Sequence, residues 1–196
     1  GNRVDDHLAR VDALRGRGRG GVPSGKYLLE VFSGGGRHTG ACSNLGLRVA
    51  SPIDLLGTPA VDLARPGAVA ELKFWVVAGL IWHATFAIPC TFDSVASHAR
   101  RTPDELAGRQ RLLRHTFDLI QCCLAHGVYV TIENPRGSRL WRHPRLRRLM
   151  RRFKFTIVDY DCCCFGCAFR KPQRLATLSP IWLGSLARAD ALNVST

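Results

Sequence analysis

A short apolar run followed at once by a cluster of glycines constrains the fold of this chain more than any other feature. Residues 27–32 read Tyr-Leu-Leu-Glu-Val-Phe, and residues 33–40 read Ser-Gly-Gly-Gly-Arg-His-Thr-Gly. The first segment has the length of a strand, and glycines allow a sharp turn and a close backbone approach to a ligand. A strand that leads into a glycine-rich turn is typical of an open α/β sheet, which binds its ligand beyond the carboxyl ends of its strands. A flexible linker is the alternative explanation for three consecutive glycines.

Composition is ordinary except in charge. The 196 residues are 46% hydrophobic and 22% charged, as expected for one globular domain with a substantial core. The formal net charge of +13 favours a polyanionic partner, such as nucleic acid, or an acidic membrane surface. A merely soluble basic protein is the alternative.

Cysteine spacing favours a reducing compartment. Four of the eight cysteines fall within residues 162–167 and two adjoin at Cys122 and Cys123, which suits disulfide bridging poorly. We therefore expect an intracellular protein, with a nuclear location left open. No signal peptide opens the chain, and the start at Gly1 rather than Met is consistent with a fragment whose targeting segment is missing.

The apolar run at residues 74–92 is nearly long enough to span a bilayer. Gly79 interrupts it and Pro89 ends it, so we expect no membrane span. The pattern instead predicts a central strand at Trp82–Ile88, buried on both faces.

Strand and helix patterns alternate along the chain. Strands are predicted at residues 27–32, 48–53, 80–88 and 128–132, and helices at 1–14, 39–45, 66–78 and 103–126. The Arg/Gly-rich segment 15–21 reads as a flexible basic linker, with single-stranded nucleic acid binding as the alternative. This alternation predicts an α/β fold with a mostly parallel sheet, right-handed crossovers and helices on both faces.

Polar residues follow the predicted strands and should meet at one edge of the sheet. Asp54 lies about 20 residues beyond the glycine cluster, where a carboxylate commonly accepts hydrogen bonds from ribose hydroxyls. An aspartate that starts a turn before Gly57 fits the same spacing. Cys90 and Glu133 follow the next two strands, so parallel pairing brings all three to the same edge.

Cys90 and Glu133 together suggest a reaction. Cys90 follows a proline that holds it rigidly, and the carboxyl group of Glu133 is a proton donor or acceptor. A thiolate can attack carbon 6 of a cytosine ring, and a carboxyl group on ring nitrogen 3 then lets carbon 5 take a methyl group. The alternative is that Cys90 is a small buried apolar side chain.

These motifs resemble those of the cytosine-5 DNA methyltransferases, which use S-adenosylmethionine on a Rossmann-like, class I methyltransferase fold. The resemblance spans roughly residues 28–178. Residues 30–36, with Gly40, are similar to the family's Asp-Leu-Phe-Ala-Gly-x-Gly motif, and Pro89-Cys90 and Glu133-Asn134 resemble its Pro-Cys and Glu-Asn pairs. The resemblance implies Cys90 as nucleophile and Glu133 as the acid that binds the target base. It also implies cofactor contacts from Phe32, Ser33, Gly34, Gly36, the ribose-binding Asp54, and the adenine-contacting Asp62 and Leu63.

The chain also departs from the family pattern. Ala87-Ile88 precede Pro89 where the family has Gly-x-Pro, residues 171–174 echo the family's Gln-Arg-rich motif only loosely, and no long target-recognition region follows Thr177. Residues 133–141 are similar to short methyltransferase-like domains of mobile-element and algal polyproteins. The alternative function is therefore a catalytically inactive nucleic-acid-binding module of such origin, and a partner domain could supply target recognition.

The resemblance divides the chain into three parts. Residues 1–25 form a basic Arg/Gly-rich extension, residues 26–182 a methyltransferase-like catalytic domain, and residues 183–196 a C-terminal tail.

A dense run of arginines follows the last predicted strand. Between Arg136 and Lys154 we expect a nucleic-acid surface, with DNA as the favoured partner. The residues assigned to it are Arg136, Arg139, Arg142, Arg145 and Arg148. A solvated helix face is the alternative explanation.

The cysteine-rich segment 162–167 contains one Cys-x-x-Cys pair, which supplies two zinc ligands at most. A second pair would require Cys122, Cys123 and His126 to approach in space. We favour structural cysteines and assign no metal ligand.

Overall fold

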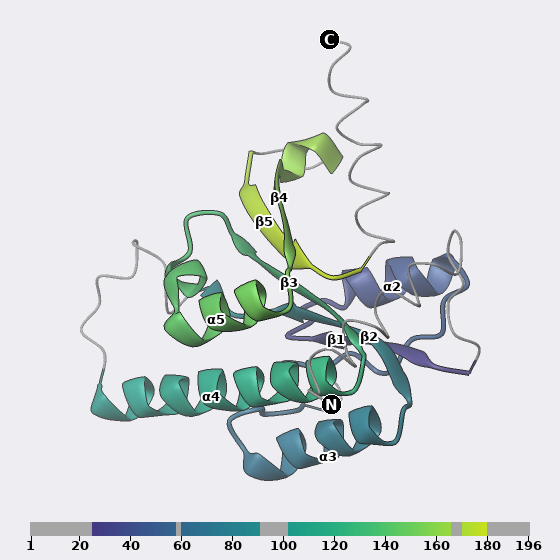
Figure 1. The fold of residues 1–196 in the computed structure, drawn as a ribbon, viewed down its shortest axis with the longest axis horizontal. Coiled ribbons are helices and arrows are strands. Elements are labelled where there is room, and N and C mark those ends of the chain that lie inside the picture. The colour runs from purple at the N-terminus through teal and green to yellow at the C-terminus, as the bar shows by residue number, and fades with distance from the viewer. Residues whose placement is uncertain (1–24, 58–59, 91–101, 166–169, 180–196) are drawn as a thin grey trace.

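The computed structural model describes residues 25–57, 60–90, 102–165 and 170–179 (Figure 1). The predicted helix 1–14, the Arg/Gly-rich linker and the tail 183–196 lie outside the described residues. The strands are β1 (Tyr27–Val31), β2 (Ile81–Ala87), β3 (Tyr129–Pro135), β4 (Thr156–Asp161) and β5 (Pro172–Thr177). The α-helices are α2 (Arg37–Asn44), α3 (Pro66–Val77), α4 (Pro103–Ala125) and α5 (Pro144–Arg152), and the 3-10 helices are η2 (Arg139–Arg142) and η3 (Cys162–Phe165).

The strands form one mixed sheet in the order β1-β2-β3-β5-β4. β1, β2 and β3 are parallel neighbours, whereas β5 is antiparallel to both β3 and β4. Helices α3, α4 and α5 lie on one side of the sheet and α2 on the other (Figure 1). The predicted α/β class, with a mostly parallel Rossmann-like sheet and helices on both faces, is confirmed.

The predicted strand at residues 48–53 is reduced to two isolated parallel bridges beside β1, at Val49 and Ile53. Val49 faces Leu28 and Ile53 faces Val31, so the register shifts by one residue between the two bridges. Pro52 lies inside this shift and has no N–H to donate, which interrupts a regular ladder. The segment still lies along β1 and delivers the following residues to its carboxyl end.

The sequence prediction missed two of the five strands, β4 and β5. Among the described strands, β4 pairs only with β5, and half of its residues are exposed, so it shows no clean alternation of apolar and polar side chains. α5 lies inside the arginine run, where Leu146 and Leu149 turn inward while most of the arginines stay exposed. An amphipathic helix with so many charged residues resembles a charged loop when only composition is considered.

The boundaries of α4 follow from local chemistry. The Thr102 hydroxyl accepts a hydrogen bond from the Glu105 N–H (3.2 Å), and the Glu105 carboxylate accepts one from the Thr102 N–H (2.8 Å). This reciprocal capping satisfies two helix N–H groups that have no partner within the helix. Pro103 occupies the first turn, and Gly127 at φ +72° lets the chain leave the helix.

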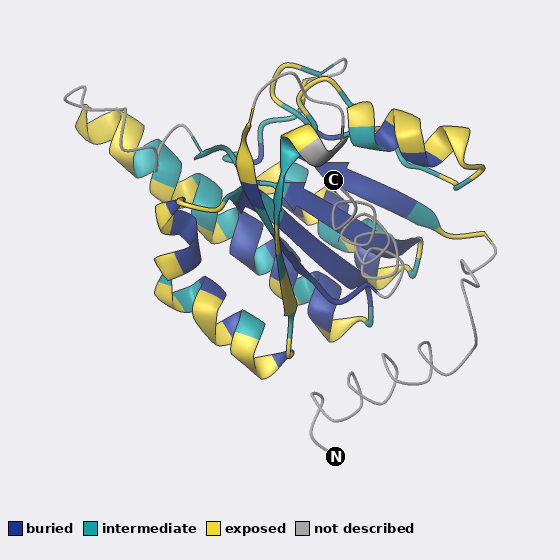
Figure 2. Ribbon diagram, turned by 90° about the horizontal axis from the view of Figure 1, so that it is seen from above, coloured by how far each residue is buried: buried dark blue, intermediate teal, exposed yellow. Residues whose placement is uncertain are grey.

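β2 is the central strand of the parallel part, and residues 81–86 are all buried (Figure 2). The prediction of a strand buried on both faces is confirmed. No helix in the described part of the chain is long and apolar enough to cross a membrane.

Candidate functional site

The turn after β1 is strained where it meets the segment 48–53. Phe32 has φ +64°, an uncommon conformation for a bulky side chain, and Gly34 and Gly36 follow at φ +53° and +64°. The N–H groups of Phe32 and Ser33 both donate to the Ile53 carbonyl oxygen, at 2.7 and 3.2 Å. Strain of this kind persists where surrounding contacts fix the backbone, and it concentrates at functional sites.

Asp54 links this turn to its own loop. One carboxylate oxygen accepts a hydrogen bond from the Gly34 N–H (2.8 Å), and the other accepts one from the Leu56 N–H (2.9 Å). The turn-starting role considered from the sequence is therefore present, combined with a link to the glycine turn. Each carboxylate oxygen keeps a further lone pair for a ligand.

Glu30 anchors the helix that follows the glycine turn. It is buried, and one of its carboxylate oxygens accepts hydrogen bonds from both the N–H (2.8 Å) and the hydroxyl of Thr39 in the first turn of α2. A carboxylate at a helix N-terminus also interacts favourably with the helix dipole. The contact fixes how α2 leaves the glycine turn.

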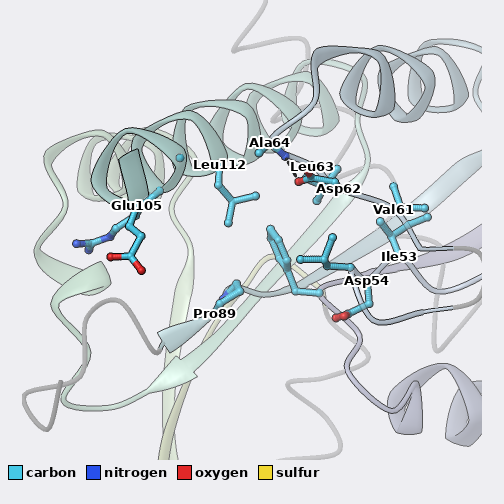
Figure 3. Close-up of a pocket in the computed structure, with 13 residues that line it drawn as sticks. Ile53, Asp54, Val61, Asp62, Leu63, Ala64, Pro89, Glu105 and Leu112 are labelled. Atoms are coloured by element: carbon cyan, nitrogen blue, oxygen red, sulfur yellow. Dashed lines mark hydrogen bonds between the residues drawn. The ribbon is translucent and has the colours of Figure 1, made fainter. Parts of the chain in front are cut away.

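A pocket of about 390 Å³ opens beside this turn. Figure 3 shows Asp54, Val61 and Leu63 on one side of it and Glu105 on the other, with Pro89 below. The described residues that line it are Phe32, Ile53, Asp54, Leu55, Val61, Asp62, Leu63, Ala64, Pro89, Glu105, Gly108, Arg109 and Leu112. Its walls are mainly apolar, with carboxylates at few points, as is usual for a small-molecule site.

Four predicted cofactor residues line this pocket, namely Phe32, Asp54, Asp62 and Leu63. Ser33, Gly34 and Gly36 do not line it; they belong to the turn that borders it. The sequence prediction missed the contribution of α4, which supplies Glu105, Gly108, Arg109 and Leu112. Leu112 carried the only signal, because it recurs with Leu113, Phe117 and Leu124 at helical spacing within the predicted helix 103–126.

The residues Asp62 and Leu63 form a short turn before α3. The Asp62 carboxylate accepts a hydrogen bond from the Ala64 N–H (2.8 Å) and lies 3.7 Å from the Arg65 guanidinium. Leu63 is buried, and its carbonyl oxygen contacts the His115 imidazole of α4 at 2.9 Å. These contacts hold the turn against α4.

Cys90 and Glu133 lie at the carboxyl ends of neighbouring parallel strands. Glu133 is paired in register with Ala87, near the end of β2, and Cys90 follows shortly after. Glu133 lies within β3 rather than beyond it, because the strand continues to Pro135. Burial raises the pKa of the Glu133 carboxyl, and the positive charge of Lys171 opposes this effect.

Asn134 holds the segment that carries Cys90. Its buried side-chain amide donates a hydrogen bond to the Ile88 carbonyl oxygen, two residues before Cys90. Residues 91–101, which follow Cys90, lie outside the described residues. The Pro89-Cys90 dipeptide is thus fixed from the neighbouring strand.

The five predicted nucleic-acid-binding arginines differ in their surroundings. Arg145 forms an ion pair with Asp118 of α4 at 2.5 Å and a hydrogen bond with Gln121 at 3.1 Å. The other four are exposed. They are Arg136, Arg139, Arg142 and Arg148.

The loosely matching segment 171–174 leads into and begins β5. Gln173 is buried opposite Pro135, and Arg174 is paired with Asn134. The Arg174 guanidinium forms a two-point ion pair with Asp159 at 2.6 and 2.7 Å, which lowers the pKa of that carboxyl. The sheet therefore brings this segment beside the Glu133-Asn134 pair.

Among the described residues, no group of three or more His, Cys, Asp or Glu side chains is arranged to hold a metal ion. Cys122 and His126 approach each other within α4 at 3.9 Å between sulfur and Nδ1. Cys167 and the side chain of Cys164 lie outside the description.

Comparison with known proteins identifies no family for this chain. No family model matches the chain, and no curated protein matches it. Among solved structures, the chain is similar to a SAM-dependent methyltransferase from Archaeoglobus fulgidus at 10% identity. The match covers 90% of this chain and 95% of the other, with a TM-score of 0.38.

Proposed function

We propose that this chain is an S-adenosylmethionine-dependent methyltransferase that acts on carbon 5 of cytosine in nucleic acid, with DNA as the expected substrate. One observation carries the proposal. A single pocket is lined by residues from three separate motifs, Phe32, Asp54 and the pair Asp62-Leu63, and by Pro89, which precedes the candidate nucleophile Cys90.

The pocket fits the cofactor in size and chemistry. Its volume of about 390 Å³ lies within the range of small-molecule sites. Phe32 and Leu63 offer apolar surface for a planar base, while Asp54 and Asp62 offer carboxylate oxygens to hydroxyl and amino groups. When bound, S-adenosylmethionine would supply an activated methyl group on a positively charged sulfur.

In the proposed reaction, the Cys90 sulfur adds to carbon 6 of the ring, and the electrons of the 5,6 double bond move to carbon 5. Glu133 donates its proton to ring nitrogen 3 and so stabilises the negative charge that develops on the ring. The raised pKa of Glu133 suits this role, because the carboxyl keeps its proton to a higher pH than a solvated one. Transfer of the methyl group to carbon 5 would leave the cofactor's sulfur as a neutral thioether. Carbon 5 then loses its proton to water, nitrogen 3 returns its proton to Glu133, and the Cys90 sulfur leaves as a thiolate as the double bond re-forms.

The target base must leave its stack to reach Cys90, so the substrate is single-stranded or has its base flipped out. The four exposed arginines that follow β3 would contact phosphates next to that base. Such contacts orient the strand and carry little sequence information.

Two variants with opposite expected effects test the proposal. Cofactor binding is measured by calorimetry, and methyl transfer by incorporation of label into cytosine-containing oligonucleotides. Cys90→Ser should bind the cofactor within about twofold of wild type and lose methyl transfer by about 100-fold or more, because the sulfur acts only in the chemical step. Asp54→Ala should weaken cofactor binding by about tenfold or more, because it also removes the acceptor for the Gly34 N–H.

Matched controls are Cys163→Ser for the thiol and Glu71→Ala for the carboxylate, since both side chains are exposed and away from the pocket. Full methyl transfer by Cys90→Ser would rule out the covalent mechanism. A folded wild-type protein that binds oligonucleotides but no cofactor would instead identify a non-catalytic binding module.

A further inference from the structure

A second hollow, of about 280 Å³, lies between α4 and η2. The described residues that line it are Arg109, Leu113, Arg139, Leu140, Arg142 and His143. Three of these carry a guanidinium group and one an imidazole, and none carries a carboxylate. The hollow is therefore a strongly positive concavity.

Within the described part of the chain, two of these arginines have no carboxylate partner. Arg139 and Arg142 are exposed, and neither forms an ion pair with a carboxylate in the described part of the chain. The nearby Arg145, in contrast, is neutralised by Asp118. Two uncompensated guanidinium groups around one concavity favour an anionic ligand.

The backbone that carries these arginines is held rigidly. The Ser138 hydroxyl oxygen accepts a hydrogen bond from the Leu140 N–H (3.1 Å), and the Trp141 indole N–H donates to the Pro135 carbonyl oxygen (2.9 Å). Leu140 and Trp141 are both buried. Because residues three apart lie above one another in a 3-10 helix, Arg139 and Arg142 point to the same side of η2.

The hollow adjoins the candidate cofactor pocket. Arg109 lines both this hollow and the 390 Å³ pocket. η2 also follows β3 closely, so the chain passes from Glu133 to Arg139 over a short segment. A ligand in the hollow therefore lies beside the candidate cofactor pocket, on a segment that follows the strand carrying Glu133.

We propose that this hollow binds a phosphodiester group of a single-stranded nucleic acid, close to the nucleotide that enters the candidate catalytic site. The inference deepens the proposed function and takes its substrate class from it. Guanidinium groups match phosphate oxygens in two-point hydrogen bonds, and a rigid pair of them fixes the position of the strand. The interaction reads no base, so it positions the substrate without selecting its sequence.

The test measures binding of a fluorescein-labelled single-stranded DNA oligonucleotide by anisotropy over a range of salt concentrations. The double variant Arg139→Gln/Arg142→Gln is compared with Arg111→Gln/Arg114→Gln, which removes the same charge from exposed positions of α4 that do not line the hollow. The first should weaken binding about tenfold and reduce the slope of log K against log salt by about 0.7 for each phosphate that the protein no longer neutralises. The second should change affinity by about twofold or less, because it alters only the general field.

The variant Arg142→Lys keeps the positive charge but loses the planar guanidinium group. Its affinity for the oligonucleotide should therefore lie between those of the wild type and of Arg142→Gln. Equal losses in the two double variants would show diffuse electrostatic attraction and overturn the proposal, as would unchanged binding by the first. Calorimetry with S-adenosylmethionine separates the two proposals. If the wild type binds no cofactor or transfers no methyl group, but still binds DNA through these arginines, only the proposed function is refuted.

Discussion

Two neighbouring rows of residues cross the sheet one position apart, and they differ completely in chemistry. The first row pairs Glu30, Thr85, Thr131 and Thr177 across β1, β2, β3 and β5. The second row pairs Val31, Phe86, Ile132 and Ala176 across the same strands. Successive residues of a strand point to opposite faces, so one face of the sheet is polar and the other apolar at this level. Both rows are buried (Figure 2).

The two rows are stabilised in different ways. The apolar row faces α3 and α4 and gains free energy by removing hydrocarbon from water. The polar row lies on the other face, where Glu30 meets α2, and a buried polar group without a hydrogen-bond partner is costly. Glu30, Thr131 and Thr177 have such partners, whereas the Thr85 hydroxyl has none among the described residues. Glu30 binds Thr39, whereas Thr131 contacts both His83 (3.0 Å) and Thr177 (2.7 Å). Burial alone therefore does not indicate which force holds a residue.

The difference has a consequence for the candidate site. On the polar face, Glu30 directs α2 away from the glycine turn, while Glu133 continues the same face toward the edge. On the apolar face, the packing of α3 and α4 sets the far wall of the pocket. The two faces therefore supply different parts of the candidate site, and substitutions on one face can be compared with substitutions on the other.

The largest expected effect is on the apolar row. Phe86→Ala should lower the free energy of unfolding by about 3–5 kcal/mol, because Phe86 is fully buried and its removal leaves a cavity. Urea denaturation at neutral pH measures the change. Phe74→Ala is the matched control, since Phe74 is 66% exposed on α3 and should change stability by about 0.5 kcal/mol or less. Equal losses in the two variants would contradict the contrast between core and surface.

Much of the parallel part of the fold was predictable from the sequence. β1, β2, α3 and α4 are bounded by glycine or proline and have clear apolar patterns, so their limits came within a residue or two. β4 and β5 were not predictable because their pairing is antiparallel and joins segments distant along the chain. An edge strand with exposed residues also lacks the hydrophobic pattern that identifies strands in the core.

The candidate site was predictable only in part for a similar reason. Asp54 follows a strand-like segment, so the rule that ligands lie beyond strand ends located it, whereas Phe32 was identified by the resemblance to the family's glycine motif. Arg109 and Glu105 were missed because their approach depends on how α4 packs, which no local pattern reveals. The polar row was missed as well. Thr131 contacts both His83 and Thr177, which lie 48 and 46 residues away from it along the chain.

An intermediate effect is expected from acidification, through His83 on the polar face. Burial, with a further contribution from His38, lowers the pKa of His83 from 6.5 to about 3. Below pH 6.5 the unfolded chain binds a proton that the folded protein does not bind until about pH 3, so this group makes stability fall as pH falls through that window. Between pH 7 and 5 its contribution is a loss of about 2 kcal/mol.

Urea denaturation of wild type and His83→Gln at both pH values measures this contribution. The difference between the two proteins isolates His83 from other titrating groups, including Glu133, whose raised pKa acts in the opposite direction. The wild type should lose more stability than the variant on acidification. Parallel curves for the two proteins would show that His83 is protonated equally in the folded and unfolded states.

The smallest expected effect sharpens the comparison by making part of the polar row apolar. Thr131→Val keeps the shape of the side chain but removes its hydrogen bonds to His83 and Thr177, so it should cost about 1 kcal/mol. Thr177→Val should cost a similar amount, because its hydroxyl also accepts a hydrogen bond from the Ser179 N–H (3.0 Å). The double variant should cost less than the sum by about 0.5 kcal/mol or more, because both single variants lose the same hydrogen bond between the two hydroxyls. Thr156→Val, at an exposed position of β4, controls for the substitution itself. Strict additivity in the double-mutant cycle would mean that the two hydroxyls contribute independently, and that the polar row is no more cooperative than the apolar row beside it.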